Sequence, residues 1–208
     1  MNQKRTTLFR EAHHILQPKG QINRLLIAIH GYAELASDFI KNFDALQSTN
    51  TLVVAPEALS KFYNKFRKPA ASWMTSHERE DEIKDYINYL NLLLKELKSN
   101  YSFNDLAILG FSQGVSTAFR WAAQLNDKDI ELFACSGSVP PELTAEDFKI
   151  NQLKKVHYFY GDEDKLLAID KAKAQIEFIK TLDLEVEAHP FKGRHEVSKN
   201  CIDLLRKS

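Results

Sequence analysis

The sequence predicts an α/β fold in which a mainly parallel central sheet carries helices on both faces. Short apolar runs alternate with stretches of helical periodicity along most of the chain, as expected when strands and helices succeed one another in a parallel sheet. Most of these runs are short and dominated by apolar residues, and 25–29 and 106–109 contain no polar residue at all, which is typical of strands covered on both faces. The length of 208 residues fits one such domain, so we expect residues 1–208 to form a single unit.

Six segments are expected to form the strands of this sheet. Each is a short run rich in apolar or β-branched residues and bounded by turn-forming residues. The segments are 25–29, 51–55, 106–109, 131–135, 156–160 and 184–188. We also interpret segment 6–16, which precedes the turn Pro18-Lys19-Gly20, as an antiparallel strand.

Four stretches have apolar residues at steps of three and four, which predicts amphipathic helices. They cover 80–97, the segment that follows Ser112, 168–180 and 195–205. Residues 56–77 are interpreted as a long loop that carries several aromatic side chains. This loop either roofs an apolar pocket or packs its own aromatic rings at the periphery, and the sequence leaves both interpretations open.

Composition argues against several classes of partner. The 28 basic residues balance 28 acidic ones, so no excess charge favours nucleic acid or an anionic membrane surface. No apolar run is long enough to cross a bilayer or to form a signal peptide, and we expect a cytoplasmic protein with no integral membrane association. Cys135 and Cys201 lie outside any metal-ligand spacing, so we interpret them as reduced packing residues and expect no metal site.

The strongest local motif is Gly110-Phe111-Ser112-Gln113-Gly114, which follows an apolar strand and opens an amphipathic helix. A nucleophilic serine on such a sharp turn needs small residues two positions away on each side. The turn also places the serine at a helix N-terminus, where free amides stabilise developing negative charge. We therefore expect Ser112 to be a nucleophile and the backbone N–H of Gln113 to be one oxyanion donor.

An acid and a histidine follow the serine, each beyond a later predicted strand. The turn Gly161-Asp162-Glu163-Asp164 offers three carboxylates, of which we favour Asp164 for orienting a histidine, although an acidic turn can also simply cap the next helix. His195 is the expected base, because it follows a glycine-containing loop and precedes the last helix. We interpret His189 as structural, and His13, His14, His77 and His157 as surface or packing residues.

A second glycine-containing loop, His30-Gly31-Tyr32, follows the first apolar strand. The backbone N–H of Tyr32 is the expected second oxyanion donor, and His30 is interpreted as a residue that shapes this loop. Trp73 and Leu166 are expected to line the substrate pocket.

Four blocks of residues make the chain similar to the phospholipase/carboxylesterase family of α/β-hydrolases, which includes bacterial carboxylesterases and acyl-protein thioesterases. They are His30-Gly31, the motif at 110–114, Gly161 with Asp164, and Gly193 with His195. The segment 135–140 is a weaker fifth match. The resemblance implies an α/β-hydrolase fold with no large separate cap domain, and a triad of Ser112, Asp164 and His195, which selects Asp164 over Asp162. The segment after Gly31 departs from the family because it lacks the usual Gly-Asp pair.

The residues together predict a serine hydrolase that cleaves small or lipid-derived carboxylic esters, with thioesters and lysophospholipids as further candidates. The expected mechanism forms an acyl-enzyme on Ser112 and needs no cofactor. An acyltransferase with the same triad would replace water by another acceptor, and a non-catalytic binding protein on the same fold is a second alternative. A homodimer is compatible with the sequence.

Overall fold

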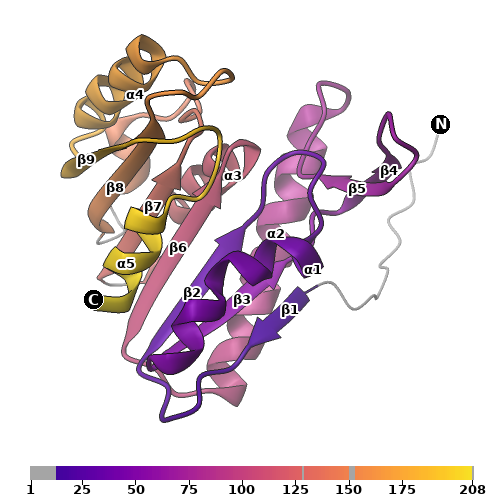
Figure 1. Cartoon of the computed structure of the whole chain (residues 1–208), viewed down its shortest axis with the longest axis vertical. Helices are drawn as coiled ribbons and strands as arrows, with labels where there is room; N and C mark the ends of the chain where they lie inside the picture. Colours follow the sequence, from indigo (N-terminus) through magenta and orange to yellow (C-terminus); the bar gives the residue numbers. More distant parts are fainter. Residues whose placement is uncertain (1–12, 128, 150–152, 208) are drawn as a thin grey trace.

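A seven-stranded sheet forms the centre of the part of the chain that the structure describes (Figure 1). The computed structural model describes residues 13–127, 129–149 and 153–207. The strand order is β1-β3-β2-β6-β7-β8-β9, and all neighbours pair in parallel except β1 and β3. The strands are β1 (His13–Leu16), β2 (Arg24–Ile29), β3 (Thr51–Pro56), β6 (Asp105–Phe111), β7 (Ile130–Cys135), β8 (Leu153–Gly161) and β9 (Val186–Phe191).

Helices cover both faces of the sheet, as predicted (Figure 1). They are α1 (Ala36–Phe39), the 3-10 helices η1 (Ile40–Ser48) and η2 (Ala145–Phe148), α2 (Arg79–Asn100), α3 (Gln113–Ala122), α4 (Ile169–Thr181) and α5 (Lys199–Lys207). Leu25 and Ile27 of β2 pack in a core with α2, α3 and α4, whereas Leu26 and Ala28 pack with α1, η1 and α5. Successive side chains of a strand point to opposite faces, so an apolar strand supplies both cores.

The long helix α2 confirms the clearest helical prediction. Its buried residues recur at steps of one, three and four and include Tyr86, Leu90, Leu93, Leu94 and Leu97. Its first turn is acidic, which suits the partial positive charge at a helix N-terminus. No helix among the described residues is long and apolar enough to cross a membrane.

Segment 56–77 is not wholly a loop, which corrects the sequence interpretation. It contains the antiparallel strands β4 (Ser60–Tyr63) and β5 (Pro69–Ser72), which lie at the end of the molecule toward which the parallel strands point (Figure 1). An isolated bridge between Glu34 and Ala71 joins this hairpin to the loop after β2. The hairpin is therefore attached next to the loop in which the sequence places an oxyanion donor.

The last strand and the last helix begin later than predicted. β9 extends to Phe191 instead of ending at 188. The amide of Val156 donates to Glu185 O, and that of Asp162 donates to Phe191 O. These bonds to β8 use odd-numbered residues, so the backbone of the even-numbered Pro190 faces the open edge of the sheet. A residue without an N–H is tolerated there.

The predicted helix 195–205 begins only at Lys199. The side chain of Ser198 accepts a hydrogen bond from the amide of Cys201 at 3.1 Å, as an N-terminal capping residue does. His195 therefore lies on the loop between β9 and α5. Both cysteines are free and buried, as predicted, and the Sγ atoms of Cys135 and Cys201 lie 3.6 Å apart in the core beneath α5.

The expected N-terminal strand is present as β1 and ends at Leu16. Residues 6–12 of that prediction lie outside the described residues.

Candidate active site

Ser112 occupies a sharp turn between β6 and α3. Its φ of 54° and ψ of −117° are far from the ordinary regions for a residue with a side chain, so the turn is held by its surroundings. A Cβ atom on Gly110 would lie 2.4 Å from the carbonyl oxygen of Gly114, and one on Gly114 would lie 2.2 Å from that of Ile29. Only glycine fits at either position, which confirms the steric argument for the motif.

The end of β7 and the segment after it pack against this turn. The amide of Ser112 donates to Cys135 O at 2.9 Å, and a Cβ on Gly137 would lie 2.3 Å from the carbonyl oxygen of Ser112. The hydroxyl of Tyr158 donates to Gly137 O at 2.6 Å, and burial raises the pKa of this phenol well above its ordinary value. These contacts fix the position of Ser112 relative to the end of the sheet.

Asp164 and His195 form a hydrogen-bonded pair across two loops. His195 Nδ1 lies 2.8 Å from Asp164 Oδ2, and the other carboxylate oxygen accepts the amides of Leu166 at 2.8 Å and Leu167 at 2.9 Å. Burial opposes ionisation of Asp164, but the hydrogen bonds from Leu167, His195 and Leu166 lower its pKa below the ordinary value. Asp164 is therefore an anion at neutral pH, which holds the His195 ring with Nε2 directed away from it.

The loops that carry this pair are packed against each other. A Cβ on Gly161 would lie 2.4 Å from the carbonyl oxygen of Gly193. Asp162 Oδ1 accepts the amide of Gly193 at 3.1 Å, and the amide of Glu163 donates to Gly193 O at 2.9 Å. Of the three acids in this turn, Asp164 contacts His195, whereas Asp162 fastens the backbone of the histidine loop.

The His195 ring is brought to the serine turn by an aromatic contact. Its centroid lies 5.0 Å from that of Phe111, the residue before Ser112. Phe111 in turn stacks on Phe39 of α1 at 6.0 Å. The histidine is thus supported by residues of the nucleophile turn itself, as well as by Asp164.

His30 shapes the loop after β2, as predicted, and is fully buried. Its Nε2 accepts the amide of Ala58 at 3.1 Å, so the proton resides on Nδ1, which donates to Gly31 O at 2.7 Å. The indole N–H of Trp73 donates to His30 O at 2.9 Å. A Cβ on Gly31 would lie 3.1 Å from Ser112 Cβ, so this loop lies directly against the nucleophile turn.

Glu34 is a residue of this site that the sequence reasoning did not identify. Its Oε2 accepts the amide of Gly31 at 2.6 Å and would lie 3.0 Å from a Cβ on that glycine, beside Ser112. Burial raises the pKa of Glu34, although the Gly31 amide and the nearby His30 and His195 partly offset this. The signal was its position, because Glu34 follows the His30-Gly31 block on the same short loop.

The expected oxyanion and pocket residues differ in how exposed they are. The amide of Gln113 begins α3, and Tyr32 follows Gly31 with its ring 59% exposed and stacked on Phe62 at 5.2 Å. Leu166 is 73% exposed beside Asp164, whereas Trp73 is only 1% exposed. Trp73 therefore supports the His30 loop from the core, because its indole is held by a buried carbonyl and packed beneath the site.

The Gln113 side chain links the nucleophile turn to the hairpin. Its Oε1 accepts the amide of Trp73 at 3.1 Å, and its Nε2 donates to Met74 O at 2.9 Å. The structure thus brings the serine turn, the Gly31 loop and the end of β5 together in one network. The whole arrangement lies at the carboxyl ends of the parallel strands, where ligands bind in α/β folds.

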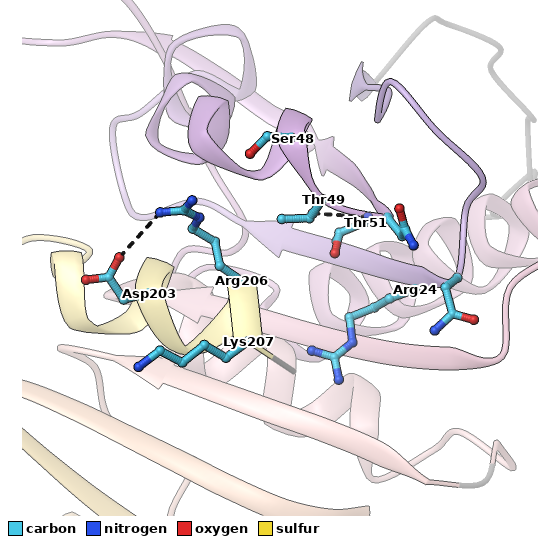
Figure 2. Close-up of a pocket in the computed structure, with 9 residues that line it drawn as sticks. Arg24, Ser48, Thr49, Thr51, Asp203, Arg206 and Lys207 are labelled. Atoms are coloured by element: carbon cyan, nitrogen blue, oxygen red, sulfur yellow. Dashed lines mark hydrogen bonds and ion pairs between the residues drawn. The ribbon is translucent and has the colours of Figure 1, made fainter.

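A large hollow, about 690 Å³, lies at the opposite end of the sheet (Figure 2). It is lined by the starts of β2 and β3 and by the end of α5, including Arg24, Thr51 and Arg206. Arg24 donates to Glu131 at 3.1 Å. This polar hollow contains none of the predicted site residues.

One protein family matches nearly the whole chain. The family described as Phospholipase/Carboxylesterase matches residues 10–208 of the sequence. No curated protein sequence gives a significant match.

Solved structures share the fold over nearly the whole chain. The esterase PE8 has a TM-score of 0.75 at 19% identity, covering 94% of this chain and 96% of its own. Acyl-protein thioesterase 2 from Zea mays has a TM-score of 0.72 at 17% identity, with the same shares covered. A phospholipase/carboxylesterase from Dyadobacter fermentans has 0.65 at 16% identity and covers 98% of each chain. At these identities the similarity shows the fold, and the family match carries the relationship.

Proposed function

Because this chain belongs to the phospholipase/carboxylesterase family of hydrolases, we propose that it hydrolyses carboxylic esters through an acyl-enzyme on Ser112. The observation that carries this proposal is the hydrogen-bonded pair of His195 and Asp164 beside a strained serine turn. A serine, a histidine and a buried carboxylate at the rim of a parallel sheet are the groups that acyl transfer requires.

In the first half of the reaction, Ser112 Oγ attacks the ester carbonyl while His195 Nε2 takes the hydroxyl proton. The amides of Tyr32 and Gln113 stabilise the oxyanion of the tetrahedral intermediate. Asp164 stabilises the imidazolium and keeps Nδ1 protonated. The intermediate collapses when His195 returns the proton to the leaving alcohol, so that the C–O bond breaks and the acyl group stays on Ser112.

In the second half, His195 takes a proton from water, whose oxygen attacks the acyl-enzyme. Collapse releases the free acid and returns the proton to Ser112. All the proton transfers use the same imidazole nitrogen, which agrees with an Asp164 that remains ionised throughout.

The substrate is proposed to carry an apolar group. Tyr32 lies in the loop after β2 and Leu166 in the turn after β8, and these two large residues are 59% and 73% exposed. Phe62 stacks on Tyr32. Exposed apolar side chains on the loops of a site favour an acyl chain or an apolar alcohol.

The test compares Ser112→Ala with Ser116→Ala on p-nitrophenyl esters of increasing acyl length. Ser112→Ala should lower kcat by roughly 10⁴-fold or more and abolish labelling by a fluorophosphonate. Ser116 lies on the same helix and its hydroxyl donates to Ser138 O at 2.6 Å, so Ser116→Ala should retain near-normal turnover. Normal turnover in Ser112→Ala would refute the proposal, and a product other than free acid would indicate an acyltransferase.

A further inference from the structure

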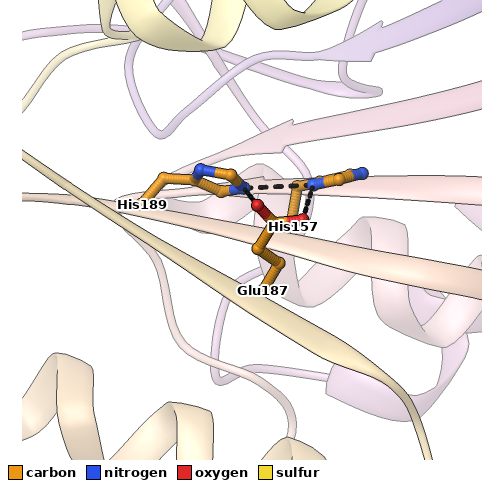
Figure 3. A group of neighbouring side chains, drawn as sticks. All are labelled: His157, Glu187 and His189. Carbon is orange, nitrogen blue, oxygen red and sulfur yellow. Dashed lines mark hydrogen bonds and ion pairs between the residues drawn. The ribbon is translucent and has the colours of Figure 1, made fainter.

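Two histidines and a glutamate, none of them a proposed catalytic residue, converge on one face of strands β8 and β9 (Figure 3). His157 and Glu187 are paired residues of the two strands, and His189 lies two residues after Glu187 on the same face. His157 Nδ1 lies 3.1 Å from His189 Nε2, and the Glu187 carboxylate lies 3.7 Å from the first ring and 3.8 Å from the second.

We propose that His157, Glu187 and His189 bind a divalent first-row transition-metal ion of the Zn²⁺ class. This site is independent of the proposed esterase activity. The expectation of no metal site rested on the spacing of the cysteines, and the histidines were interpreted as packing or structural residues. The structure brings the possible ligand atoms of these three residues within 4.8 Å of one another, although His157 is distant from the other two in the sequence.

The donor set and its spacing fit such an ion. Two imidazoles and one carboxylate suit zinc and its neighbours better than Mg²⁺ or Ca²⁺, which prefer oxygen ligands. Donors on one tetrahedral zinc lie about 3.3 Å apart, because each is roughly 2.0–2.1 Å from the metal. The two nitrogens already approach this separation, and the glutamate side chain, which is 49% exposed, has room to move a few tenths of an ångström inward.

The surroundings hold the two rings in place. His157 is 6% exposed and stacks on Phe133 at 4.9 Å, and His189 stacks on Phe159 at 4.4 Å. Burial lowers the pKa of both histidines. Preset ligands reduce the loss of side-chain freedom on binding.

Lys155 is the cation that now neutralises this carboxylate. Its Nζ lies 2.8 Å from Glu187 Oε2 and 3.2 Å from Glu185 Oε1. Binding of a metal would therefore displace the ammonium from Glu187, and Lys155 would keep Glu185 as a partner. Removing this competitor, as in Lys155→Gln, should strengthen metal binding.

A metal at this position would join the strands that lead to the candidate active site. Beyond its metal ligand, β8 leads to the turn with Asp164, and β9 leads to the loop with His195. β9 is an edge strand with a neighbour on one side only. Binding should therefore stabilise the folded state by an amount that rises with the logarithm of the free metal concentration once this exceeds Kd.

The first test is calorimetric titration of the untagged full-length protein with ZnCl₂. The expected result is one ion per chain, with affinity at least about tenfold weaker in Glu187→Gln and in His189→Gln. Glu187 is half-exposed, so Glu187→Gln should fold normally even if a variant of the buried His157 fails to fold. His77→Gln is the matched control, because His77 also lies beside a glutamate, 3.8 Å from Glu78, but is 88% exposed.

Binding that is absent, or unchanged in both variants, would overturn the proposal; the second result would place the zinc elsewhere, for example at His195. A second measurement is the melting temperature with and without ZnCl₂. At a zinc concentration about 100 times Kd the wild type should gain roughly 5–10 °C, and Glu187→Gln, with binding at least about tenfold weaker, should gain about half as much or less at the same concentration. Equal gains in both proteins would also contradict the assignment.

Discussion

Two carboxylates at the candidate active site, one buried and one half-buried, have opposite pKa shifts. Asp164, in the turn after β8, accepts two backbone amides and the His195 ring, and its pKa lies below the ordinary value. Glu34, in the loop after β2, accepts the Gly31 amide, and burial raises its pKa. Both residues belong to the candidate active site, so the difference between their pKa shifts comes from their immediate surroundings.

The comparison teaches that hydrogen-bond donors can outweigh the effect of burial on the pKa of a carboxylate. Burial penalises both carboxylates, and each hydrogen bond to the ionised form offsets part of that penalty. Three donors outweigh burial at Asp164, whereas one strong donor at Glu34 does not. The turn after β8 therefore holds a permanent anion, and the loop after β2 holds an acid that gains a proton more easily.

The largest effect is expected from Asp164→Asn. The amide would favour the wrong tautomer of His195 and could not stabilise the imidazolium, so kcat should fall by about 10⁴-fold. Glu34→Gln keeps an oxygen that can accept the Gly31 amide and should stay within about tenfold of wild type. Steady-state hydrolysis of p-nitrophenyl acetate measures both variants. Equal losses in the two would show that the carboxylates do not differ in role.

A smaller effect is expected in the pH dependence of stability for Glu34→Gln. A raised pKa means that Glu34 contributes stability below its unfolded pKa and that this contribution is lost as pH rises through its folded pKa. Glu34→Gln should therefore gain stability relative to wild type as the pH rises above about 4.5, the ordinary value of a glutamate pKa. Thermal melts of both proteins below and above this pH provide the measurement.

Asp164→Asn should show the opposite trend in the same melts. The lowered pKa of Asp164 means that its contribution is present above the unfolded pKa and is lost as pH falls through the folded one. The deficit of this variant should therefore be greatest near neutral pH and shrink toward about pH 3. Parallel trends for the two variants would contradict the comparison.

The smallest effect is expected from Ala33→Gly. Ala33 has a φ of 63°, a conformation that costs a residue with a side chain about 1–2 kcal/mol. Glycine removes this strain but gains freedom in the unfolded chain, so the net stabilisation should be within about 1 kcal/mol. Chemical denaturation measures it, with Asp183→Gly as the control, because Asp183 has a φ of 58° in the turn after α4. A destabilised Ala33→Gly would show that the strain is not relieved.

Most of the sheet could be predicted because its signals are local. Strands such as β2 are apolar throughout and buried on both faces, so their pattern identifies them without knowledge of their partners. The serine turn was predicted for the same reason, since its glycines, its preceding strand and its following helix lie within one short segment. These elements agree with the structure to within a residue or two at most ends.

The hairpin and the last strand were mispredicted because pairing defines them. β4 and β5 are each four residues long, and a bridge to Glu34 anchors them to a distant loop. β9 includes His189 and Pro190, which local propensities exclude from a strand interior. The open edge tolerates them, a feature that becomes visible only once the strand order is known.

Residues that converge from separate elements were the hardest to identify. The group formed by His157, Glu187 and His189 depends on the register between β8 and β9, which are separated in the chain by α4. Glu187 and His189 are two residues apart, a spacing that places side chains on one face of a strand, but the predicted strand 184–188 ended one residue before His189. The contribution of His157 requires the neighbouring strand and its alignment, which no local pattern provides.

The free side of β9 resists sheet extension between copies of this chain. Hydrogen bonds to β8 use the odd-numbered residues from Glu185 to Phe191, so an added strand would have to bond to Val186, Ala188 and Pro190. Pro190 has no N–H to offer, and the edge also carries the charges of Glu185 and Glu187. Interrupted ladders and edge charges are devices by which proteins avoid edge-to-edge aggregation.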